Sequence, residues 1–293
     1  MSTFANWLEG ARPRTWPAAV SPVLAASGVA WFYDAFDLPI ALLCLLVAFA
    51  LQVGVNFAND YSDGIRGTDA ERVGPMRLVG SGAATPKTVK LAAFACFGVA
   101  ALAGLVIVAL SGHWWLLIVG AACILAAWYY TGGKRPYGYA GLGEVFVFLF
   151  FGLVAVLGTV YVMADRIPMA AVWVACAIGF LACAILVANN LRDITGDTKA
   201  GKKTLATRLG DSGTRWFYIA LLFAAVIAVI LAGTASSMRA AMPGLLFVVV
   251  VLPAMRRVRE GATGKDLIAV LKATGIAELV CAAGLFVGYL VAA

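Results

Sequence analysis

Residues 38–69 read LPIALLCLLVAFALQVGVNFANDYSDGIRGTD, and this stretch indicates what kind of fold the chain adopts. Residues 38–58 carry no charge, and an apolar run of that length suits a helix that crosses the hydrocarbon core of a bilayer. Polar side chains begin at Gln52 and Asn56, inside the run, and become dense after residue 58. The stretch therefore predicts a transmembrane helix that ends in a cluster of acids and amides at one membrane face.

The rest of the chain has the same character. Of its 293 residues, 63% are hydrophobic and 13% are charged, whereas soluble domains average about 45–50% and about 25%. Apolar runs this long are helical, because only helices and closed barrels satisfy their backbone in lipid. We predict an all-α transmembrane bundle, a single domain over residues 1–293, with nine spans at residues 15–33, 38–58, 88–110, 113–130, 142–163, 168–191, 214–233, 240–255 and 268–291.

The basic residues predict the orientation. With nine spans and a cytoplasmic N-terminus, only Arg166 and Arg239 of the 22 Lys and Arg residues lie on the outer side, which is the positive-inside pattern. The first apolar run is long enough to span, so we expect a retained helix rather than a cleaved signal peptide. The net charge of +7 fits topology and contact with anionic lipid or substrate better than nucleic acid.

The first acidic segment continues the polar side of its helix. Side chains spaced four, three and four residues apart share one helical face: Gln52, Asn56, Asn59 and Asp63. Such a stripe must face the bundle interior or a watery cavity. Asp69 is out of step with the stripe, but Gly64 and Gly67 would let the chain turn back and bring it near.

A second acidic segment echoes the first. Asn189, Asp193 and Asp197 are spaced by four and again share one face. In the first segment Ala58-Asn59-Asp60 is followed by Asp63, and in the second Ala188-Asn189-Asn190 is followed at the same spacing by Asp193. Both segments follow helices that run toward the same membrane face. We therefore expect two half-sites that face one another.

Clustered carboxylates stay ionised only near cations, and Mg²⁺ binds through one or two carboxylates together with substrate phosphates. The two half-sites thus predict two Mg²⁺ positions with a diphosphate between them, and the predicted metal ligands are Asn59, Asp60, Asp63, Asp193 and Asp197. The predicted catalytic acids are Asp60, Asp63, Asp69, Asp193 and Asp197. The predicted diphosphate contacts are Asn59, Arg66, Arg77, Lys134, Asn189, Lys202 and Lys203. The competing interpretation is a set of solvated loop charges and helix caps, which would not produce two matching segments.

Two further features leave alternatives open. The segment 129–139 contains four tyrosines, glycines that allow turns, and two cations. It fits a loop that contacts phosphate or acceptor as well as it fits a juxtamembrane aromatic belt. Glu278 lies deep in the last predicted span, where a carboxyl group is either functional or a protonated structural residue.

The two acidic segments resemble those of the UbiA superfamily of intramembrane prenyltransferases, which have nine transmembrane helices and Asp-rich motifs after the second and sixth. The opening Ala11-Arg12-Pro13-Arg14-Thr15-Trp16-Pro17, the run Tyr130-Thr131-Gly132-Gly133 and the run 200–210 are also similar. Five residues separate Asp63 from Asp69, as in the 1,4-dihydroxy-2-naphthoate polyprenyltransferase (MenA-type) branch, whereas the 4-hydroxybenzoate branch has three.

The resemblance implies Mg²⁺-dependent transfer of a polyprenyl chain from polyprenyl diphosphate to 1,4-dihydroxy-2-naphthoate. Carbon dioxide and diphosphate leave, and demethylmenaquinone forms for menaquinone biosynthesis. Trp128, Tyr129 and Tyr130 are candidates to stabilise an allylic cation. The resemblance also implies a bacterial plasma membrane location with the site facing the cytoplasm. Alternatives are another aromatic acceptor, such as 4-hydroxybenzoate, and a secondary transporter; the oligomeric state is not predicted.

Overall fold

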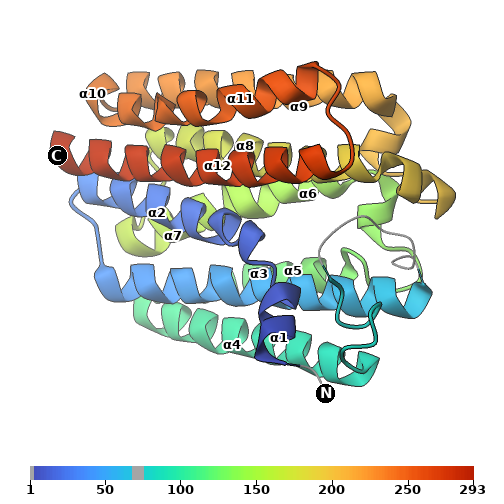
Figure 1. Ribbon diagram of the computed structural model, residues 1–293. Coiled ribbons are helices and arrows are strands. Elements are labelled where there is room, and N and C mark those ends of the chain that lie inside the picture. The colour runs from blue at the N-terminus through green and yellow to red at the C-terminus, as the bar shows by residue number, and fades with distance from the viewer. Residues whose placement is uncertain (1–2, 68–75) are drawn as a thin grey trace.

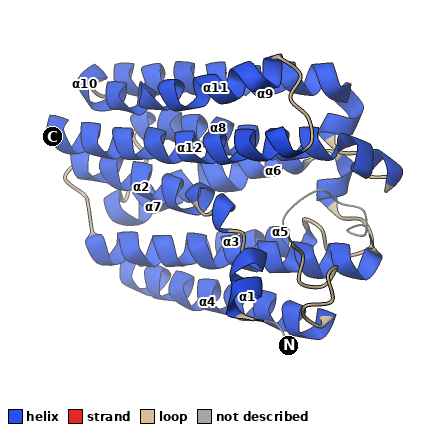
Figure 2. Ribbon diagram, viewed as in Figure 1, coloured by secondary structure: helices blue, strands red, loops and turns tan. Residues whose placement is uncertain are grey.

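The computed structural model describes residues 3–67 and 76–293, and all regular elements in these ranges are helical (Figures 1 and 2). In chain order they are α1 (Phe4–Gly10), η1 (Pro13–Thr15), α2 (Pro17–Phe32), α3 (Leu38–Arg66), α4 (Pro86–Ser111), α5 (Leu116–Tyr129), η2 (Tyr137–Ala140), α6 (Gly143–Val147), η3 (Phe148–Val154), α7 (Ala155–Ala164), α8 (Met169–Lys199), α9 (Leu205–Thr234), α10 (Met238–Ala241), η4 (Met242–Leu246), α11 (Phe247–Arg259) and α12 (Lys265–Ala292).

Within the described residues, seven helical segments are long and apolar enough to cross a membrane. They are α3, α4, the continuous segment Gly143–Ala164, α8, α9, the segment Met238–Arg259 and α12. The prediction of an all-helical membrane protein is confirmed. The other two predicted spans coincide with α2 and α5, which are apolar but have 16 and 14 residues, short of the roughly 20 that a full crossing requires.

Three helices extend beyond the predicted spans into the polar segments. Helix α3 continues to Arg66 and ends where Gly67 adopts φ +71°, the left-handed C-terminal geometry that favours glycine. Helix α8 continues to Lys199. Helix α9 begins at Leu205, ahead of the predicted start at 214, and is kinked at Gly210 with φ +70°. The sequence-based boundaries stopped at the membrane edge, whereas the helices continue because their polar side chains find partners there.

Close helix contacts depend on small residues. A Cβ atom added at Gly288 of α12 would lie 2.0 Å from the Ala240 carbonyl oxygen, and one at Gly284 would lie 2.2 Å from the Pro243 carbonyl oxygen. Gly28 of α2 similarly faces the backbone of Phe286. Without a hydrophobic driving force between helices in lipid, such close backbone approach is a main source of packing energy.

The packed helices leave a space between two groups. Buried apolar residues form a large cluster among α2, α7, α8, α9, α11 and α12, and a smaller cluster around α3 and α4. Figure 1 shows α3 and α4 along one side of the bundle and α9 and α11 along the other, with α2 and α7 between. The π-helical turn η3 interrupts the segment Gly143–Ala164 beside this space. The candidate site lies between the two clusters.

Candidate active site

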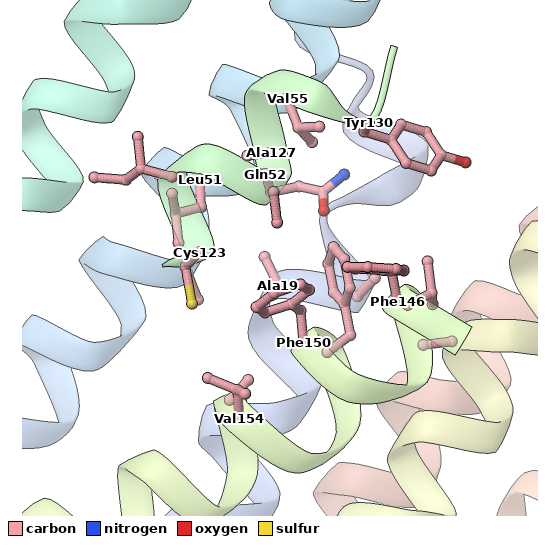
Figure 3. Close-up of a pocket in the computed structure, with 18 of the residues that line it drawn as sticks. Ala19, Leu51, Gln52, Val55, Cys123, Ala127, Tyr130, Phe146, Phe150 and Val154 are labelled. Atoms are coloured by element: carbon pink, nitrogen blue, oxygen red, sulfur yellow. The ribbon is translucent and has the colours of Figure 1, made fainter. Parts of the chain in front are cut away.

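A cavity of about 640 Å³ lies between the two clusters. Figure 3 shows apolar side chains that line it from four directions: Ala19 of α2, Leu51 and Val55 of α3, Cys123 and Ala127 of α5, and Phe146, Phe150 and Val154 of the segment Gly143–Ala164. At one end the lining becomes polar, with Asn59, Asp63, Arg77, Asn189, Asp193, Asp197 and Lys202. The cavity therefore offers a long apolar volume with a charged mouth, the shape that suits an amphipathic ligand.

The predicted polar stripe of α3 is buried and lines this cavity. Gln52 and Asn56 are 6% and 3% exposed. Their amide nitrogens donate to Thr15 Oγ1 at 2.8 and 3.0 Å, and Asn56 also donates to the Ala11 carbonyl at 3.0 Å. The middle of the stripe thus holds the segment 11–15 against α3, a role that the spacing alone did not indicate.

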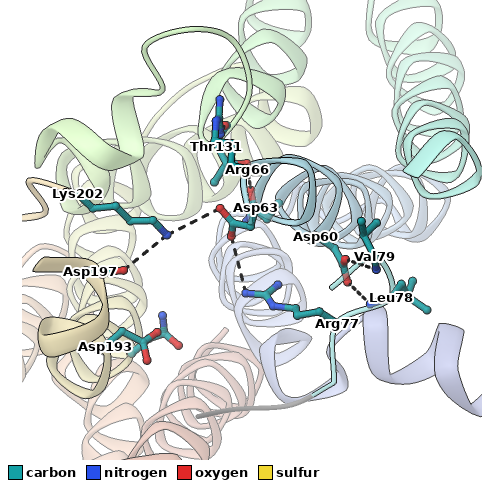
Figure 4. Close-up of polar contacts among 12 residues, drawn as sticks. Asp60, Asp63, Arg66, Arg77, Leu78, Val79, Thr131, Asp193, Asp197 and Lys202 are labelled. Carbon is teal, nitrogen blue, oxygen red and sulfur yellow. Dashed lines mark hydrogen bonds and ion pairs between the residues drawn. The ribbon is translucent and has the colours of Figure 1, made fainter. Parts of the chain in front are cut away.

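Asp63 and Asp197, one from each acidic segment, face one another across Lys202 (Figure 4). The Lys202 ammonium lies 3.8 Å from Asp63 Oδ1 and 3.6 Å from Asp197 Oδ1. The Arg77 guanidinium lies 4.0 Å from Asp63 Oδ2. The predicted convergence of the two segments is present in the geometry, with cations held between the carboxylates.

Asp193 takes part in a second cation pair. Arg192 donates from Nε to Asp193 Oδ1 at 2.7 Å and from Nη2 to Oδ2 at 2.8 Å. The same Nη2 donates to Asn189 Oδ1 at 2.8 Å. Arg192 was not among the predicted site residues, although its place between Asn189 and Asp193 in the sequence was the available signal.

Asp60 has a different setting from the other acids. Its carboxylate oxygens accept hydrogen bonds from the backbone N–H groups of Leu78 and Val79 at 2.8 and 2.9 Å. The side chain is fully buried, and Asp60 is not among the residues lining the cavity. This geometry favours a role in anchoring the segment 76–80 to α3, rather than the predicted metal and catalytic role.

The loop after α5 contacts residues of the polar mouth. Thr131 donates to Asn59 Oδ1 at 2.7 Å, and Arg66 donates to the carbonyl oxygens of Thr131 and Gly133. Tyr139 donates its hydroxyl to Asp63, and the Lys202 ammonium lies 4.5 Å from its ring centroid. Burial and the Asp63 charge raise the pKa of Tyr139 above its ordinary value, so the hydroxyl remains a hydrogen-bond donor. The first interpretation of this segment, a loop that belongs to the site, fits this geometry.

The predicted basic residues divide into two groups. Arg77 and Lys202 line the cavity. Arg66 is directed to loop carbonyls instead, while Lys134 and Lys203 are exposed and do not line the cavity. Asp69 lies outside the described residues.

Only one of the three aromatic candidates faces the cavity. Tyr130 lines it, whereas Trp128 packs against Phe94 at 4.8 Å between ring centroids, and Tyr129 is half exposed. Trp128 and Tyr129 do not line the cavity, because an α-helical turn directs successive side chains to different faces, so their role in stabilising the allylic cation stays a prediction. Phe146 and Phe150, which the sequence analysis missed, line the cavity instead.

The donors at the mouth fit a divalent cation. Among the described side chains, no group of three or more His, Cys, Asp or Glu residues is placed to share one metal ion. The carboxylates of Asp63 and Asp197 nevertheless lie on either side of Lys202, and Asp193 pairs with Arg192 of its own helix. Carboxylate and amide oxygens of Asn59, Asp63, Asn189, Asp193 and Asp197 gather there, and Mg²⁺ prefers such oxygens. These residues suit Mg²⁺ bound through few protein ligands together with a phosphate group.

Glu278 and Glu144 lie apart from these acids. Glu278 is fully buried, and neither carboxyl oxygen finds a hydrogen-bond partner among the described residues. Glu144 accepts a hydrogen bond from Asn190 at 3.0 Å. The geometry brings neither residue into the group around Lys202.

Comparison with known proteins identifies relatives across most of the chain. The model of the UbiA prenyltransferase family matches residues 19–276. A 1,4-dihydroxy-2-naphthoate octaprenyltransferase of Mycobacterium tuberculosis is 52% identical over 96% of both chains. A protein of the same name from Escherichia coli is 40% identical over 75% of this chain and 74% of its own.

Solved structures show the same fold at low identity. The apo structure of a UbiA homologue from Aeropyrum pernix superposes with a TM-score of 0.74 at 17% identity, over 92% of this chain and 97% of that one. A UbiA homologue from Archaeoglobus fulgidus, bound to GPP and Mg²⁺, gives a TM-score of 0.65 at 17% identity over 97% and 99%. At these identities the likeness supports the fold alone.

Proposed function

The chain belongs to the UbiA prenyltransferase family, and on that premise we propose that it transfers a polyprenyl group from polyprenyl diphosphate to 1,4-dihydroxy-2-naphthoate, releasing diphosphate and CO₂. The product is the hydroquinone demethylmenaquinol, which a separate two-electron oxidation converts to demethylmenaquinone, a precursor in menaquinone biosynthesis. The observation that carries this proposal is the cavity of about 640 Å³, with apolar walls and a mouth formed by both acidic segments. A polyprenyl diphosphate has the same division between a charged head and an apolar tail.

The relatives support the choice of acceptor. Two mycobacterial proteins named 1,4-dihydroxy-2-naphthoate octaprenyltransferase are 52% and 53% identical, and each matches nearly its whole length. The family alone would also admit other acceptors, such as 4-hydroxybenzoate. Identity at this level over whole chains favours the naphthoate.

At the mouth, we propose that Lys202 and Arg77 contact the diphosphate. Both line the cavity and both approach Asp63. Arginine offers planar, bidentate contacts to phosphate oxygens, and lysine offers a compact charge. Lys203, Lys134 and Arg66 lie farther out in this geometry, and we keep them as proposed contacts for a substrate-bound arrangement.

Magnesium is the proposed cofactor, held by Asn59, Asp63, Asp193 and Asp197. When bound, Mg²⁺ supplies charge neutralisation for the departing diphosphate. The Archaeoglobus fulgidus homologue was solved with GPP and Mg²⁺, which supports this assignment. Asp60 remains in the proposed set through its position in the motif, with its backbone hydrogen bonds favouring a structural role. Asp69 is proposed from the motif alone.

The chemistry follows from the shape of the cavity. The bond between the prenyl C1 and the diphosphate oxygen breaks, and positive charge develops on the allylic carbons. Tyr130, Phe146 and Phe150 line the cavity, and aromatic faces stabilise such charge. The ring carbon that carries the carboxylate forms the new bond to C1. The electron pair of the C–CO₂ bond then returns to the ring as CO₂ leaves.

For topology, we propose nine membrane crossings with the N-terminus and the site on the cytoplasmic side of a bacterial plasma membrane. The 16-residue α2 and 14-residue α5 complete the nine, and snorkelling flanking residues or local bilayer thinning accommodate short helices. The bacterial relatives support the location. We further propose that residues 1–293 act as one domain, with the prenyl tail extending toward membrane lipid.

The test is product formation by the purified protein in lipid nanodiscs. Dihydroxynaphthoate and a polyprenyl diphosphate are supplied with Mg²⁺ or with EDTA, and the prenylated hydroquinone is oxidised in air and measured as demethylmenaquinone by mass spectrometry. We expect product only with Mg²⁺. Prenylation of 4-hydroxybenzoate, without prenylation of the naphthoate, would retain the site and overturn the acceptor.

A further inference from the structure

Arg12 has an unusual backbone conformation beside the cavity. Its φ and ψ are +53° and +69°, in the left-handed region that non-glycine residues seldom adopt. Such a conformation is strained and persists only where surrounding contacts impose it. The following residue is Pro13, which further restricts the conformations open to Arg12.

The contacts that impose this conformation come from within the bundle. The Thr15 hydroxyl donates to the Arg12 carbonyl at 2.9 Å and accepts from Gln52 and Asn56 of α3 at 2.8 and 3.0 Å. The preceding carbonyl of Ala11 accepts from Asn56. Buried amide side chains are expensive in a membrane helix, and here two of them hold the backbone on both sides of Arg12.

The guanidinium held in this way lines the cavity. Its Nη2 atom is buried and has no hydrogen-bond partner among the described residues. The other cavity-lining cations, Arg77 and Lys202, lie close to carboxylates. Because a buried charge-bearing donor without a partner is destabilising, the geometry indicates that Arg12 meets an anionic group of a ligand.

The position separates this group from the diphosphate. Arg12 is tied to α3 at Asn56, seven residues before Asp63, which corresponds to about 10 Å along a helix. This anchoring of the Arg12 backbone, through Ala11 and Thr15, favours an anion on the apolar side of the acidic mouth. The lining of the cavity includes Gln52, Tyr130 and Phe146 (Figure 3), and these side chains suit an aromatic ring.

We propose that Arg12 binds the carboxylate of the aromatic acceptor and selects acceptors that carry one. This inference rests on the proposed function, since it assigns a subsite of the same cavity. A guanidinium matches a carboxylate in a planar, two-point contact. Hydrogen bonds to charged groups contribute enough to change affinity about tenfold or more. Carboxylate-bearing ligands should therefore depend on Arg12, and neutral analogues should not.

The experiment compares two ligands and three proteins. Binding of 1-hydroxy-2-naphthoate and of 1-naphthol, which lacks the carboxylate, is measured calorimetrically on wild-type protein, Arg12→Gln and Arg14→Gln in nanodiscs. Arg14 lies two residues away and is exposed, so its variant matches the change in charge. Thermal melting reports whether each variant is folded, and Arg12→Lys is the substitute if Arg12→Gln fails to fold. Steady-state assays give KM for each substrate.

We expect Arg12→Gln to weaken the binding of 1-hydroxy-2-naphthoate about tenfold or more and to leave the binding of 1-naphthol unchanged. The same substitution should raise KM for dihydroxynaphthoate but not for the prenyl diphosphate. Arg12→Lys should show the same selectivity to a smaller extent. Equal loss for both ligands, a raised KM for the prenyl diphosphate, or no change in either ligand would overturn the proposal. These results are interpreted only if the wild-type protein prenylates the naphthoate. Failure of the Arg12 proposal is therefore distinguished from failure of the proposed function.

Discussion

Lys202 provides the sharpest test of how the mouth works, because its ammonium lies between the two acidic segments, where we propose that a metal ion binds. Its ammonium lies 3.8 Å from Asp63 and 3.6 Å from Asp197, and its side chain is 14% exposed. At an effective dielectric constant near 20, each contact is worth a gross attraction of about 4 kcal/mol. Desolvation of three charged groups cancels most of this attraction. We take ~1–2 kcal/mol as the net free energy by which the two carboxylates favour Lys202. A metal ion must overcome this preference in order to bind there.

Lys202→Met removes the charge and keeps much of the side-chain volume. We predict that the variant binds Mn²⁺, a spectroscopic substitute for Mg²⁺, about tenfold more tightly without prenyl diphosphate, since about 1.4 kcal/mol corresponds to a tenfold change. The same variant should lose about tenfold or more in kcat/KM, because a proposed diphosphate contact is removed. Metal affinity and turnover therefore move in opposite directions.

Mn²⁺ binding is measured by electron paramagnetic resonance, with turnover assayed on the same preparations. Lys199→Met is the matched control, because Lys199 is exposed at the end of α8 and should leave both quantities unchanged. If Lys202→Met binds Mn²⁺ no more tightly than wild type, the idea that Lys202 stands in for a metal ion is refuted.

Three further predictions follow from single contacts. Asp60→Ala leaves the backbone N–H groups of residues 78 and 79 without their acceptors. We therefore expect the free energy of unfolding to fall by about 2–5 kcal/mol, visible as a lower melting temperature with and without Mn²⁺. A loss of stability that appears only when Mn²⁺ is present would contradict this. Gly288→Val places carbon atoms against the Ala240 carbonyl and should yield little folded protein, whereas Ala269→Val at an exposed position of α12 should not. Tyr139→Phe should raise KM for prenyl diphosphate several-fold. The pH profile of activity between pH 7 and 9 should be the same in both proteins, because the raised pKa of Tyr139 keeps the wild-type hydroxyl protonated throughout. A pH profile that differs between the two proteins would refute the role of this hydroxyl as a hydrogen-bond donor.

The fold was largely predictable because lipid restricts the backbone so strongly. Long uncharged runs predict helices, and those runs coincide with the observed apolar segments. The ends of the helices were less predictable. Helix α3 continues to Arg66 and α8 to Lys199, because helical hydrogen bonding does not stop where the membrane does. Similarly, no hydropathy pattern indicates that η3 becomes a π-helical turn.

The site was predictable where spacing controls it and unpredictable where tertiary contacts do. The four-residue spacing placed Asp63 and Asp197 on inward faces, and the structure brings them to one lysine. The backbone partners of Asp60 come from residues 78 and 79, across the turn that follows the motif. Likewise, the hydroxyl of Tyr139 reaches Asp63 only because the loop after α5 folds over the mouth. Such contacts depend on loop geometry, which residue spacing does not encode.

The central claim is that this chain joins a polyprenyl group to dihydroxynaphthoate at the mouth formed by its two acidic segments. The most direct measurement is formation of the prenylated product, measured as demethylmenaquinone after oxidation in air, by wild-type protein and Asp63→Asn in nanodiscs, each with Mg²⁺ and with EDTA. We predict product from wild type only with Mg²⁺, and at least a hundredfold less from Asp63→Asn, because the substitution removes charge at the point where the two segments meet. Product at near wild-type rates from Asp63→Asn, or product in EDTA, would contradict the account.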